Sequence, residues 1–279
     1  MDNKVKHVLG ISGGKDSAAL AIYMRDNYPE MEIEYFFTDT GKELPEVYDF
    51  LHKLEGYLGQ TILKLNADKD FDFFLMQHNN YLPSPQARWC TSSMKIKPFE
   101  KWVVENYLNH GYTVYSYVAI RSDEEYREGY QSRYDNLKMS LPFKEFGIDK
   151  QGVIDILEHS GLGLPKYYEW RSRSGCTFCF FQRKIEWVNL KERHPEAFEE
   201  AKRYEKKATA SGSPFTWSEK ESLEELEKPI RIREIKNDYK KRLERAKKKK
   251  QANPLRPDDN NIDLDDLYGI SKTCLACHK

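Results

Sequence analysis

The 279-residue sequence contains no long hydrophobic segment, no excess of charge of either sign and only five cysteines. No stretch approaches the roughly 18 uninterrupted apolar residues of a membrane-spanning helix, and the first residues include no apolar run typical of a secretion signal. Lysine plus arginine and aspartate plus glutamate both number 45, so no overall field attracts nucleic acid or a membrane surface. We therefore expect a cytoplasmic protein without a membrane partner, in which contact with a polyanion is limited to a local patch.

The few cysteines argue against a disulfide scaffold. Their number is odd, and four of them form two C-x-x-C pairs, Cys176 with Cys179 and Cys274 with Cys277. In a chain without an export signal, such pairs favour metal binding or redox chemistry over disulfides. The composition, 39% apolar and 32% charged, is that of a globular protein. A chain of this length buries a core large enough to fold without covalent cross-links. Together, these features lead us to expect an enzyme.

The N-terminal part of the sequence alternates between strand and helix patterns. Short apolar runs predict strands at residues 5–11, 32–38, 61–65 and 113–120. Helical spacing of apolar residues predicts helices at 17–24, 44–58 and 99–108. This alternation indicates an α/β fold with a doubly wound, mostly parallel sheet. Right-handed crossovers bring the carboxyl ends of such strands to one edge, where ligands bind, and residues 12–17, 39–41 and 121–125 fall there.

The rest of the chain is less regular. Residues 126–173 are mostly loop, with one predicted helix at 151–159. A strongly helical pattern at 186–207 is followed by a break of small residues at 208–215 and then by a charged segment. We therefore predict an α/β domain at residues 1–190 and a helical extension at 191–279 that ends in the second C-x-x-C pair.

A glycine-rich loop, Gly10-Ile-Ser-Gly-Gly-Lys-Asp-Ser17, joins the first predicted strand to the first predicted helix. Its glycines let backbone N–H groups surround an anion, and the helix N-terminus adds a partial positive charge. Ser12 and Ser17 can donate hydrogen bonds to phosphate. Lys15 can neutralise phosphate charge, and Asp16 can cap the helix or hold a metal ion. The spacing is not that of a Walker A loop, and the alternative is an ordinary strand–helix turn with a serine or aspartate cap.

This S-G-G-K-D-S loop resembles the PP-loop of the ATP pyrophosphatases, the adenine nucleotide alpha hydrolase superfamily. Later segments are similar, in order, to the phosphoadenosine phosphosulfate (PAPS) reductase group. They are T-D-T-G-K-E-L-P-E at 38–46, A-I-R-S-D-E-E-Y-R at 119–127, and L-P-F, V-I-D, G-L-P and R-S-G-C-T-F-C between 141 and 179. The resemblance extends over residues 5–200. It implies a doubly wound sheet that binds ATP and Mg²⁺ beyond the loop, where attack at the α-phosphate expels pyrophosphate.

The resemblance also implies roles for single residues. It implies that catalysis depends on Lys15, Asp16, Asp39 and Arg121. It implies a nucleotide site formed by Ser12, Gly13, Gly14, Lys15, Asp16, Ser17, Asp39, Thr40, Arg121 and Glu124. Two alternatives stay open. Asp39 can be a helix-capping turn residue. Arg121, expected to offer its fork to phosphate, can instead form a surface ion pair with Glu124 or Glu125.

The cysteines near the end of the chain distinguish it from PAPS reductases, which carry an E-C-G-L-H segment whose cysteine attacks the sulfonucleotide. Here Cys274-Leu-Ala-Cys277-His278 shares only a cysteine and a histidine with that segment. The sequence is more similar to the sulfur-transfer branch of the family, the DndC-like proteins of DNA phosphorothioation and their relatives in phage defence. That resemblance implies adenylation of an oxygen on nucleic acid and displacement of AMP by a sulfur nucleophile, with a sulfur-donor or defence-system protein as partner. The alternatives are a PAPS or APS reductase and a nucleotide-sensing subunit of a defence complex without turnover.

The paired cysteines predict a tetrahedral four-thiolate metal site formed by Cys176, Cys179, Cys274 and Cys277. Zinc and a [4Fe–4S] cluster both accept four thiolates. The spacing favours zinc, whereas the resemblance to sulfur-transfer enzymes favours iron–sulfur. His278 is an alternative ligand in place of one cysteine.

The fifth cysteine, Cys90, lies in R-W-C-T-S-S-M-K-I-K-P, a segment that relatives share in similar form. The flanking Arg88, Lys95 and Lys97 favour a reactive thiolate. A small buried hydrophobic residue, or a cluster of Cys90 with the first C-x-x-C pair, is the alternative.

Between Lys236 and Lys250, nine side chains are lysine or arginine, against Asp238 and Glu244. This local patch indicates either a nucleic-acid contact or a solvated helix face. A second group can stack on a base or simply pack; it consists of Tyr167, Tyr168, Trp170, Arg171 and Arg173.

Overall fold

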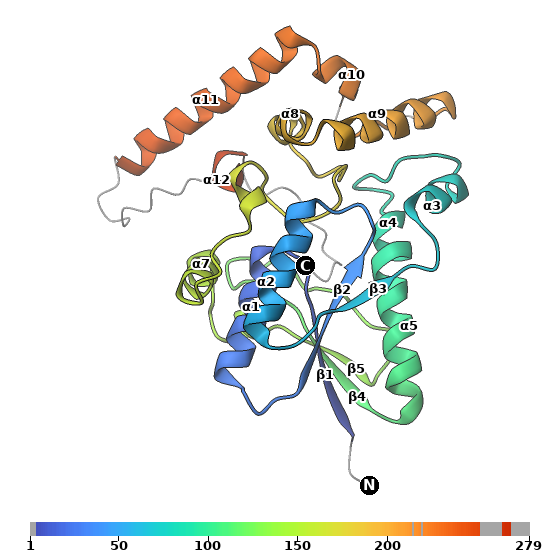
Figure 1. The fold of residues 1–279 in the computed structure, drawn as a ribbon, viewed down its shortest axis with the longest axis vertical. Helices are drawn as coiled ribbons and strands as arrows, with labels where there is room; N and C mark the ends of the chain where they lie inside the picture. The colour runs from blue at the N-terminus through green and yellow to red at the C-terminus, as the bar shows by residue number, and fades with distance from the viewer. Residues whose placement is uncertain (1–3, 214, 219, 252–263, 269–279) are drawn as a thin grey trace. The chain divides into compact units, whose positions relative to one another are not determined.

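The computed structural model describes residues 4–213, 215–218, 220–251 and 264–268 (Figure 1). This part of the chain forms two compact units. The first contains residues 4–74 and 88–166, and the second contains residues 75–87 and the described residues from 167 onward. The predicted division of the chain at residue 190 stays a prediction.

The first unit is built on a five-stranded parallel sheet. Its strands are β1 (Val5–Gly10), β2 (Ile33–Asp39), β3 (Leu63–Asn66), β4 (Thr113–Tyr117) and β5 (Leu137–Ser140). Their order is β3-β2-β1-β4-β5, so the chain runs outward from β1 to β3 and then crosses to the other side of β1. The structure confirms the predicted α/β fold with a parallel sheet and adds β5, which the sequence did not predict. Because the strand order reverses at β1, the loop after β1 opens at the place where such sheets bind ligands.

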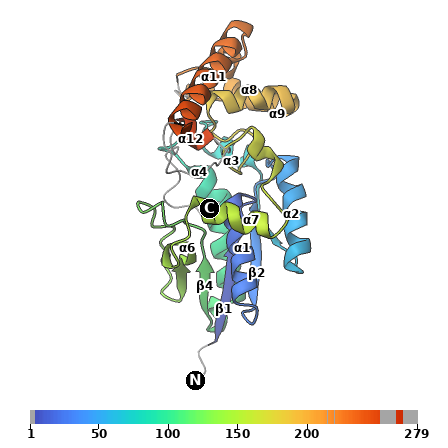
Figure 2. The same cartoon turned by 90° about the vertical axis from the view of Figure 1, so that its left-hand side faces the viewer.

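Helices cover both faces of this sheet, as Figures 1 and 2 show. Neighbouring residues of β2 point to opposite faces. Phe36 stacks on Phe99 of α5 (Lys97–Asn106), with ring centroids 4.8 Å apart, whereas Phe37 meets Tyr48 of α2 (Pro45–Leu58) edge to face. The main helices of this unit are α1 (Lys15–Asn27), α2 (Pro45–Leu58), α5 (Lys97–Asn106) and α7 (Lys150–His159). Shorter helical segments are α3 (Phe71–Gln77), α4 (Trp89–Thr91), a π-helical turn (Ser92–Ile96) and α6 (Pro142–Glu145).

The second unit is helical. Its helices are α8 (Lys184–Arg193), α9 (Pro195–Ala210), α10 (Leu223–Leu226), α11 (Pro229–Gln251) and α12 (Leu264–Tyr268). Trp187 and Trp217 are among its largest buried side chains. The buried Glu205 of α9 accepts backbone N–H groups of Trp217 and Leu223 at 2.9 and 2.6 Å, which ties the following loop to the helix.

The single helix predicted at 186–207 is wrong, because the chain forms two helices there. His194 separates them with φ −135° and Pro195 begins α9. Proline has no N–H to continue the α8 ladder, and it moves the preceding residue out of the helical region. The helix that follows extends to Ala210, into the segment predicted as a break.

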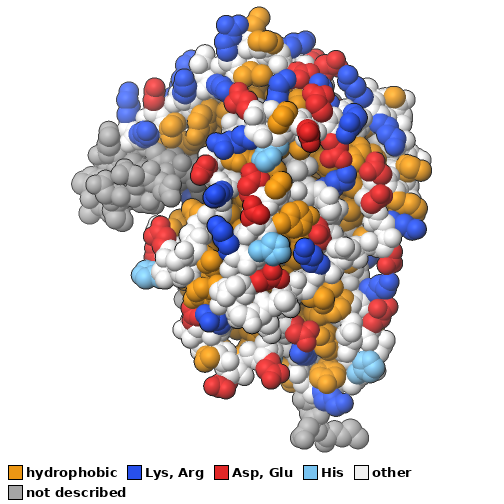
Figure 3. Space-filling model, viewed as in Figure 1, with side chains coloured by type: hydrophobic (Ala, Val, Ile, Leu, Met, Phe, Trp, Pro, Cys, Tyr) orange, Lys and Arg blue, Asp and Glu red, His pale blue; other side chains and the backbone are white. Residues whose placement is uncertain are grey.

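Among the described helices, none combines the length and the hydropathy of a membrane-spanning segment. On the face shown in Figure 3, lysine and arginine side chains are interspersed with aspartate and glutamate, in keeping with the equal numbers of positive and negative residues.

Candidate functional site

The glycine-rich loop leaves the sheet at the carboxyl end of β1 and is closed by its own serines. The N–H of Ile11 donates to the carbonyl of Phe36 at 2.7 Å, which holds the start of the loop on β2. The N–H of Ser12 donates to Ser17 Oγ at 3.0 Å, and the two hydroxyl oxygens lie 3.1 Å apart. The N–H of Gly14 donates to Ser12 Oγ at 3.3 Å. The loop is therefore a compact turn with backbone N–H groups next to a helix N-terminus.

Two positions in this loop are occupied by glycine for physical reasons, one because of its backbone conformation and the other because of its place at a helix N-terminus. Gly13 has φ +71°, a conformation that residues with a side chain rarely adopt. A Cβ on Gly13 would lie 2.6 Å from Val47 Cγ1 of α2, so even alanine would force a shift. Gly14 is the N-cap residue of α1 and has no side chain to cover the helix N-terminus. The loop backbone is thus left close to any anion bound at that N-terminus.

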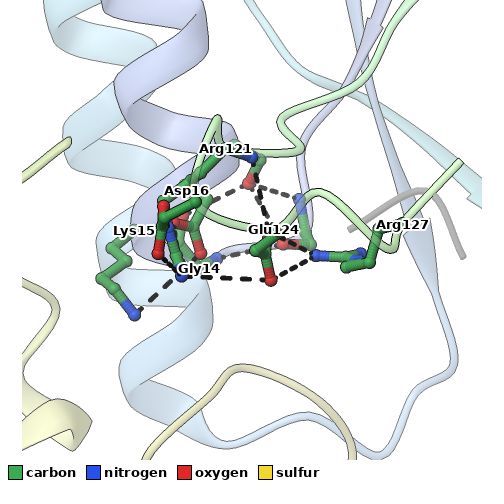
Figure 4. Close-up of polar contacts among 9 residues, drawn as sticks. Gly14, Lys15, Asp16, Arg121, Glu124 and Arg127 are labelled. Atoms are coloured by element: carbon green, nitrogen blue, oxygen red, sulfur yellow. Dashed lines mark hydrogen bonds and ion pairs between the residues drawn. The ribbon is translucent and has the colours of Figure 1, made fainter. Parts of the chain in front are cut away.

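The charged residues of the loop meet the chain that follows β4 (Figure 4). Lys15 is buried, with 6% of its surface exposed, and its Nζ lies 4.0 Å from Asp16 Oδ2. The other carboxylate oxygen of Asp16 accepts a hydrogen bond from Arg121 Nη1 at 3.0 Å. The predicted convergence of the loop and residue 121 at one sheet edge is confirmed.

The fork of Arg121 is already occupied by a neighbouring carboxylate. Its Nε and Nη2 donate to the two oxygens of Asp123 at 2.9 and 3.1 Å. In this structure the fork is held by Asp123, and the role of Arg121 at a phosphate stays a prediction. The predicted alternative, a surface pair with Glu124 or Glu125, is right in the partner Glu124, at 4.0 Å, and wrong in its exposure, because Arg121 is only 7% exposed.

Glu124 belongs to the same network. Its backbone N–H contributes to the turn after β4, and its carboxylate lies 4.0 Å from Arg121 Nη2. The same carboxylate accepts two hydrogen bonds from Arg127 Nη1, at 2.9 and 2.8 Å, and both side chains are buried. Asp123 and Arg127 were not among the predicted site residues. The signal for them was the run R-S-D-E-E-Y-R, in which the sequence offers several possible pairings.

The ionisation of this network follows from its own charges. Burial would raise the pKa of Asp16, but the charges of Lys15 and Arg121 outweigh burial and lower it. Burial would also raise the pKa of Asp123, but hydrogen bonds from Arg121 outweigh burial and lower it. Burial would lower the pKa of Arg121, but the Asp16 charge and the Asp123 bonds raise it. The carboxylates of Asp16 and Asp123 are therefore ionised at neutral pH and form ionic contacts with Arg121.

Asp39 and Thr40 are used by the turn after β2. One carboxylate oxygen of Asp39 accepts the N–H of Gly41 and the hydroxyl of Tyr48, each at 2.8 Å. Thr40 donates to Glu43 at 3.1 Å, and both are buried. Asp39 thus stabilises a turn, in keeping with the alternative that it is a turn residue before a helix. Its role at a nucleotide stays a prediction.

The predicted metal site is described only in part. Cys176 and Cys179 lie in a tight turn of the second unit, where the N–H of Cys179 donates to the carbonyl of Cys176 at 3.1 Å, and both are half-buried. Cys274, Cys277 and His278 lie outside the described residues. Within the described ranges, no group of three or more histidine, cysteine or acidic side chains is placed to hold a metal.

Cys90 is half-buried at the start of α4, just before the π-helical turn of the first unit. Its predicted reactivity stays a prediction.

The basic segment lies on α11, where some of its charges are paired. Lys236 Nζ lies 2.5 Å from Glu192, and Arg242 bonds Asp238 at 2.8 Å within the helix. The aromatic and arginine side chains between Tyr167 and Arg173, which were considered for stacking on a base, are instead packed within the protein. Tyr167, Trp170 and Arg171 are buried, and Tyr168 is half-buried.

The loop, helix α1 and Arg121, which follows β4, all fall within the residues matched by one family model. Residues 6–138 match the family model of the phosphoadenosine phosphosulfate reductase domain. The match runs from β1 into β5 and contains the glycine-rich loop, Asp16 and Arg121.

The chain is also similar to two uncharacterised proteins of Methanocaldococcus jannaschii. One is 29% identical over 126 residues, which are 45% of this chain and 25% of the relative. The other is 25% identical over 200 residues, which are 67% of this chain and 44% of the relative. The chain therefore spans less than half the length of these relatives.

Three solved structures are similar to this chain at low identity. A PAPS reductase from Candida auris in a phosphate complex is 14% identical, with a TM-score of 0.45 over 61% of this chain and 81% of that one. The U34-tRNA thiolase NcsA from Methanococcus maripaludis, with its [4Fe-4S] cluster, is 14% identical, with a TM-score of 0.41 over 75% and 71%. An NH3-dependent NAD synthetase from Campylobacter jejuni is 14% identical, with a TM-score of 0.40 over 75% and 87%.

Proposed function

We propose that this chain is an ATP-dependent enzyme that adenylates its substrate, releases pyrophosphate and supports sulfur transfer to nucleic acid in a defence context. The observation that carries the proposal is the loop between β1 and α1, at the reversal of strand order, with Gly13 at positive φ and a buried lysine beside it. The match of residues 6–138 to the phosphoadenosine phosphosulfate reductase domain supports membership of the adenine nucleotide alpha hydrolase superfamily. The nucleic-acid acceptor and the sulfur-donor or defence-system partner rest on sequence resemblance.

In this proposal the triphosphate lies against the loop. The backbone of Gly13 and Gly14 and the hydroxyls of Ser12 and Ser17 bind phosphate oxygens, and Lys15 offsets their charge. Pyrophosphate leaves because these donors stabilise the charge that develops on it. The remaining assigned residues, Asp39, Thr40 and Glu124, shape the two neighbouring turns.

Asp16 fits the ion that accompanies ATP. It is the acidic residue of the loop, its side chain is 26% exposed, and its Oδ2 lies 4.0 Å from Lys15 Nζ. Mg²⁺ in nucleotide sites uses one or two carboxylates and completes its shell with phosphate oxygens and water. Asp16 would hold the ion, which would supply charge neutralisation at the phosphates.

Two glycine variants, one in the loop and one control in α2, test the nucleotide site. Gly13→Val places a branched side chain at φ +71° and against Val47, and we expect it to abolish ATP binding and pyrophosphate release. Gly56→Ala in α2 is the control, because a Cβ there meets nothing within 4 Å. Calorimetry with ATP and a pyrophosphate-release assay give the readouts. ATP binding by Gly13→Val equal to that of the parent would show that the loop is not the site.

Two other functions are separated by the same assays. The PAPS reductase domain match favours sulfonucleotide reduction as the second candidate, which predicts sulfite release from PAPS. A nucleotide-sensing subunit would bind ATP without releasing pyrophosphate.

We also propose that Cys176, Cys179, Cys274 and Cys277 hold zinc or a [4Fe–4S] cluster. The tight, half-buried turn at the first pair suits two adjacent ligands of one metal centre. Metal analysis and a visible spectrum after anaerobic purification distinguish the two.

A further inference from the structure

Helix α11 carries a cluster of exposed basic side chains. Within the described residues, its cations that form ion pairs are Arg231, Lys236 and Arg242. Six other cations of the helix are exposed and make no ion pair in the described part of the chain; they are Arg233, Lys240, Lys241, Arg245, Lys247 and Lys248. Because the chain as a whole has no net charge, α11 is a local concentration of positive charge.

The helical period sorts these six cations into two rows. Successive residues of an α-helix are rotated by about 100°, so positions seven residues apart lie almost above one another. The first row follows this spacing and consists of Arg233, Lys240 and Lys247. The second row lies about 110° further around the helix axis and consists of Lys241, Arg245 and Lys248. The opposite side of the helix is apolar, with Ile235 buried and Leu243 half-buried, so both rows face solvent.

Cations at this density work against the helix that carries them. Lys241 and Arg245 are four residues apart, and Arg245 and Lys248 are three apart, spacings at which like charges destabilise a helix. The one acidic residue between Lys240 and Lys248 is Glu244, which makes no ion pair within the described residues. A bound polyanion would replace this repulsion with attraction.

The width of the helix and the placing of the rows fit the major groove of double-stranded DNA. An α-helix with its side chains is about 10–12 Å across, and the groove is about 12 Å wide, with a phosphate backbone along each edge. Two rows on the flanks of one helix place three cations against each backbone. The major groove of A-form RNA is too narrow for this arrangement.

Other polyanions fit α11 less well. A helix that lies on a membrane buries its apolar face in lipid, whereas the apolar face of α11 is used within the second unit, where the helix contacts α8 and Ile235 is buried. A single strand of nucleic acid has one backbone and would leave one row unused. Duplex DNA is therefore the partner that uses both rows.

We propose that α11 binds double-stranded DNA from within the major groove, with the first row against the phosphates of one strand and the second row against those of the other. The inference rests on the nucleic-acid acceptor of the proposed function, and it names the binding surface and the form of the nucleic acid. Asn237 and Glu244 lie between the rows, at exposed positions that face the base edges in this arrangement. An amide side chain pairs with adenine there and a carboxylate accepts from cytosine, so these two residues are placed to read sequence.

Fluorescence anisotropy of the full chain with a labelled DNA duplex of two helical turns, measured over a range of salt concentrations, tests the proposal. For the parent we expect log Kd to rise with log salt with a slope of about 5, because six cations release counterions from phosphates. Two triple variants each replace one row by glutamine, which keeps helix propensity; they are Arg233→Gln/Lys240→Gln/Lys247→Gln and Lys241→Gln/Arg245→Gln/Lys248→Gln. Each should bind at least about tenfold more weakly at about 0.1 M salt, with a slope lower by about 3. The matched control removes three exposed cations of α9 and should keep the affinity of the parent within about twofold; it is Arg203→Gln/Lys206→Gln/Lys207→Gln.

Several results would overturn the proposal. A parent slope below about 3 would mean that the six cations do not meet phosphates. A loss of affinity in only one of the two row variants, or equal losses in the row variants and the control, would exclude a helix held between two backbones. Binding of duplex RNA, single-stranded DNA or anionic lipid vesicles as tightly as duplex DNA would identify a different partner. Circular dichroism checks that the variants keep the helix content of the parent. A parent that binds ATP in calorimetry but no duplex DNA would overturn this inference alone and leave the nucleotide site standing.

Discussion

Arg121 is the residue on which the charge network at the loop depends most, and its replacement by methionine tests that network. Arg121 is 7% exposed and makes hydrogen bonds to Asp16 at 3.0 Å and to Asp123 at 2.9 and 3.1 Å. Methionine keeps much of the volume and removes the charge. The variant leaves Asp16 and Asp123 without the cation between them, whereas Glu124 keeps its two bonds to Arg127.

The expected loss of stability is about 3 kcal/mol at pH 7. Removing one partner of a buried ion pair costs about 3–5 kcal/mol. The lower end applies because the side chains of Asp16 and Asp123 are 26% and 36% exposed and keep part of their hydration. Arg133→Met is the matched control. Arg133 pairs with Glu100 at 3.1 Å but is 71% exposed, so its loss should change stability little.

The loss should also depend on pH with a definite sign. The pKa values of Asp16 and Asp123 are lowered in the folded protein, so the stability they contribute is present above the usual carboxyl pKa of 3.8 and is lost as pH falls through the folded values. Without Arg121 the carboxyls of Asp16 and Asp123 should protonate at a higher pH than in the parent. Protonation removes their unpaired negative charges, so the free energy of unfolding of the variant rises relative to that of the parent as the pH falls. The difference between parent and Arg121→Met should therefore narrow from pH 7 to pH 4.

Urea unfolding followed by circular dichroism at both pH values gives the free energies, and hydrogen exchange in β1 and β4 assigns the loss to the first unit. An equal loss for Arg121→Met and Arg133→Met at pH 7 would refute the reasoning. So would a difference between parent and Arg121→Met that stays constant from pH 7 to pH 4.

Two further predictions follow from single contacts. Asp123→Asn should raise ATP affinity by roughly three- to tenfold, because a neutral amide holds the Arg121 fork less strongly than a carboxylate and releases it to phosphate; calorimetry that finds weaker binding would mean that Asp123 positions Arg121 instead. Glu205→Ala should lower the free energy of unfolding by about 2–4 kcal/mol, since it leaves two buried backbone N–H groups, those of Trp217 and Leu223, without acceptors. A loss below 1 kcal/mol in urea unfolding would show that the loop finds other partners.

Burial explains why some strands could be predicted from the sequence, although β3, which was also predicted, has only Leu65 buried. β1 contains the adjacent buried residues Val8 and Leu9, and β2 contains the buried aromatic residues Tyr35, Phe36 and Phe37, so short hydrophobic runs mark both strands in the sequence. The missed strand, β5, has four residues, of which only Leu137 is buried. Its pairing with β4 supplies the reason for its extended conformation, and that pairing is not visible in local sequence.

The candidate site was predictable at the level of topology and not at the level of partners. The sheet order brings the loop after β1 and the turn after β4 together, so that the proximity of Asp16 and Arg121 follows from the fold class. Which acid occupies the Arg121 fork depends on the path of a few residues after Ile120. Asp123 is two residues away from Arg121 and Glu124 three, and both spacings were compatible with a pair.

Because Asp123 holds the Arg121 fork, the loop is expected to attract a nucleotide in a different way. Six neighbouring side chains carry three positive and three negative charges; they are Lys15, Asp16, Arg121, Asp123, Glu124 and Arg127. A network that is neutral as a whole exerts little net attraction on a triphosphate. Affinity at this loop must then come mainly from backbone N–H groups at the start of α1 and from the cation that accompanies ATP. ATP binding should accordingly fall strongly when Mg²⁺ is chelated, and the fall should be smaller in Asp123→Asn, where Arg121 can reach phosphate. Equal dependence on Mg²⁺ in calorimetric titrations of the two proteins would show that Arg121 stays with the protein throughout.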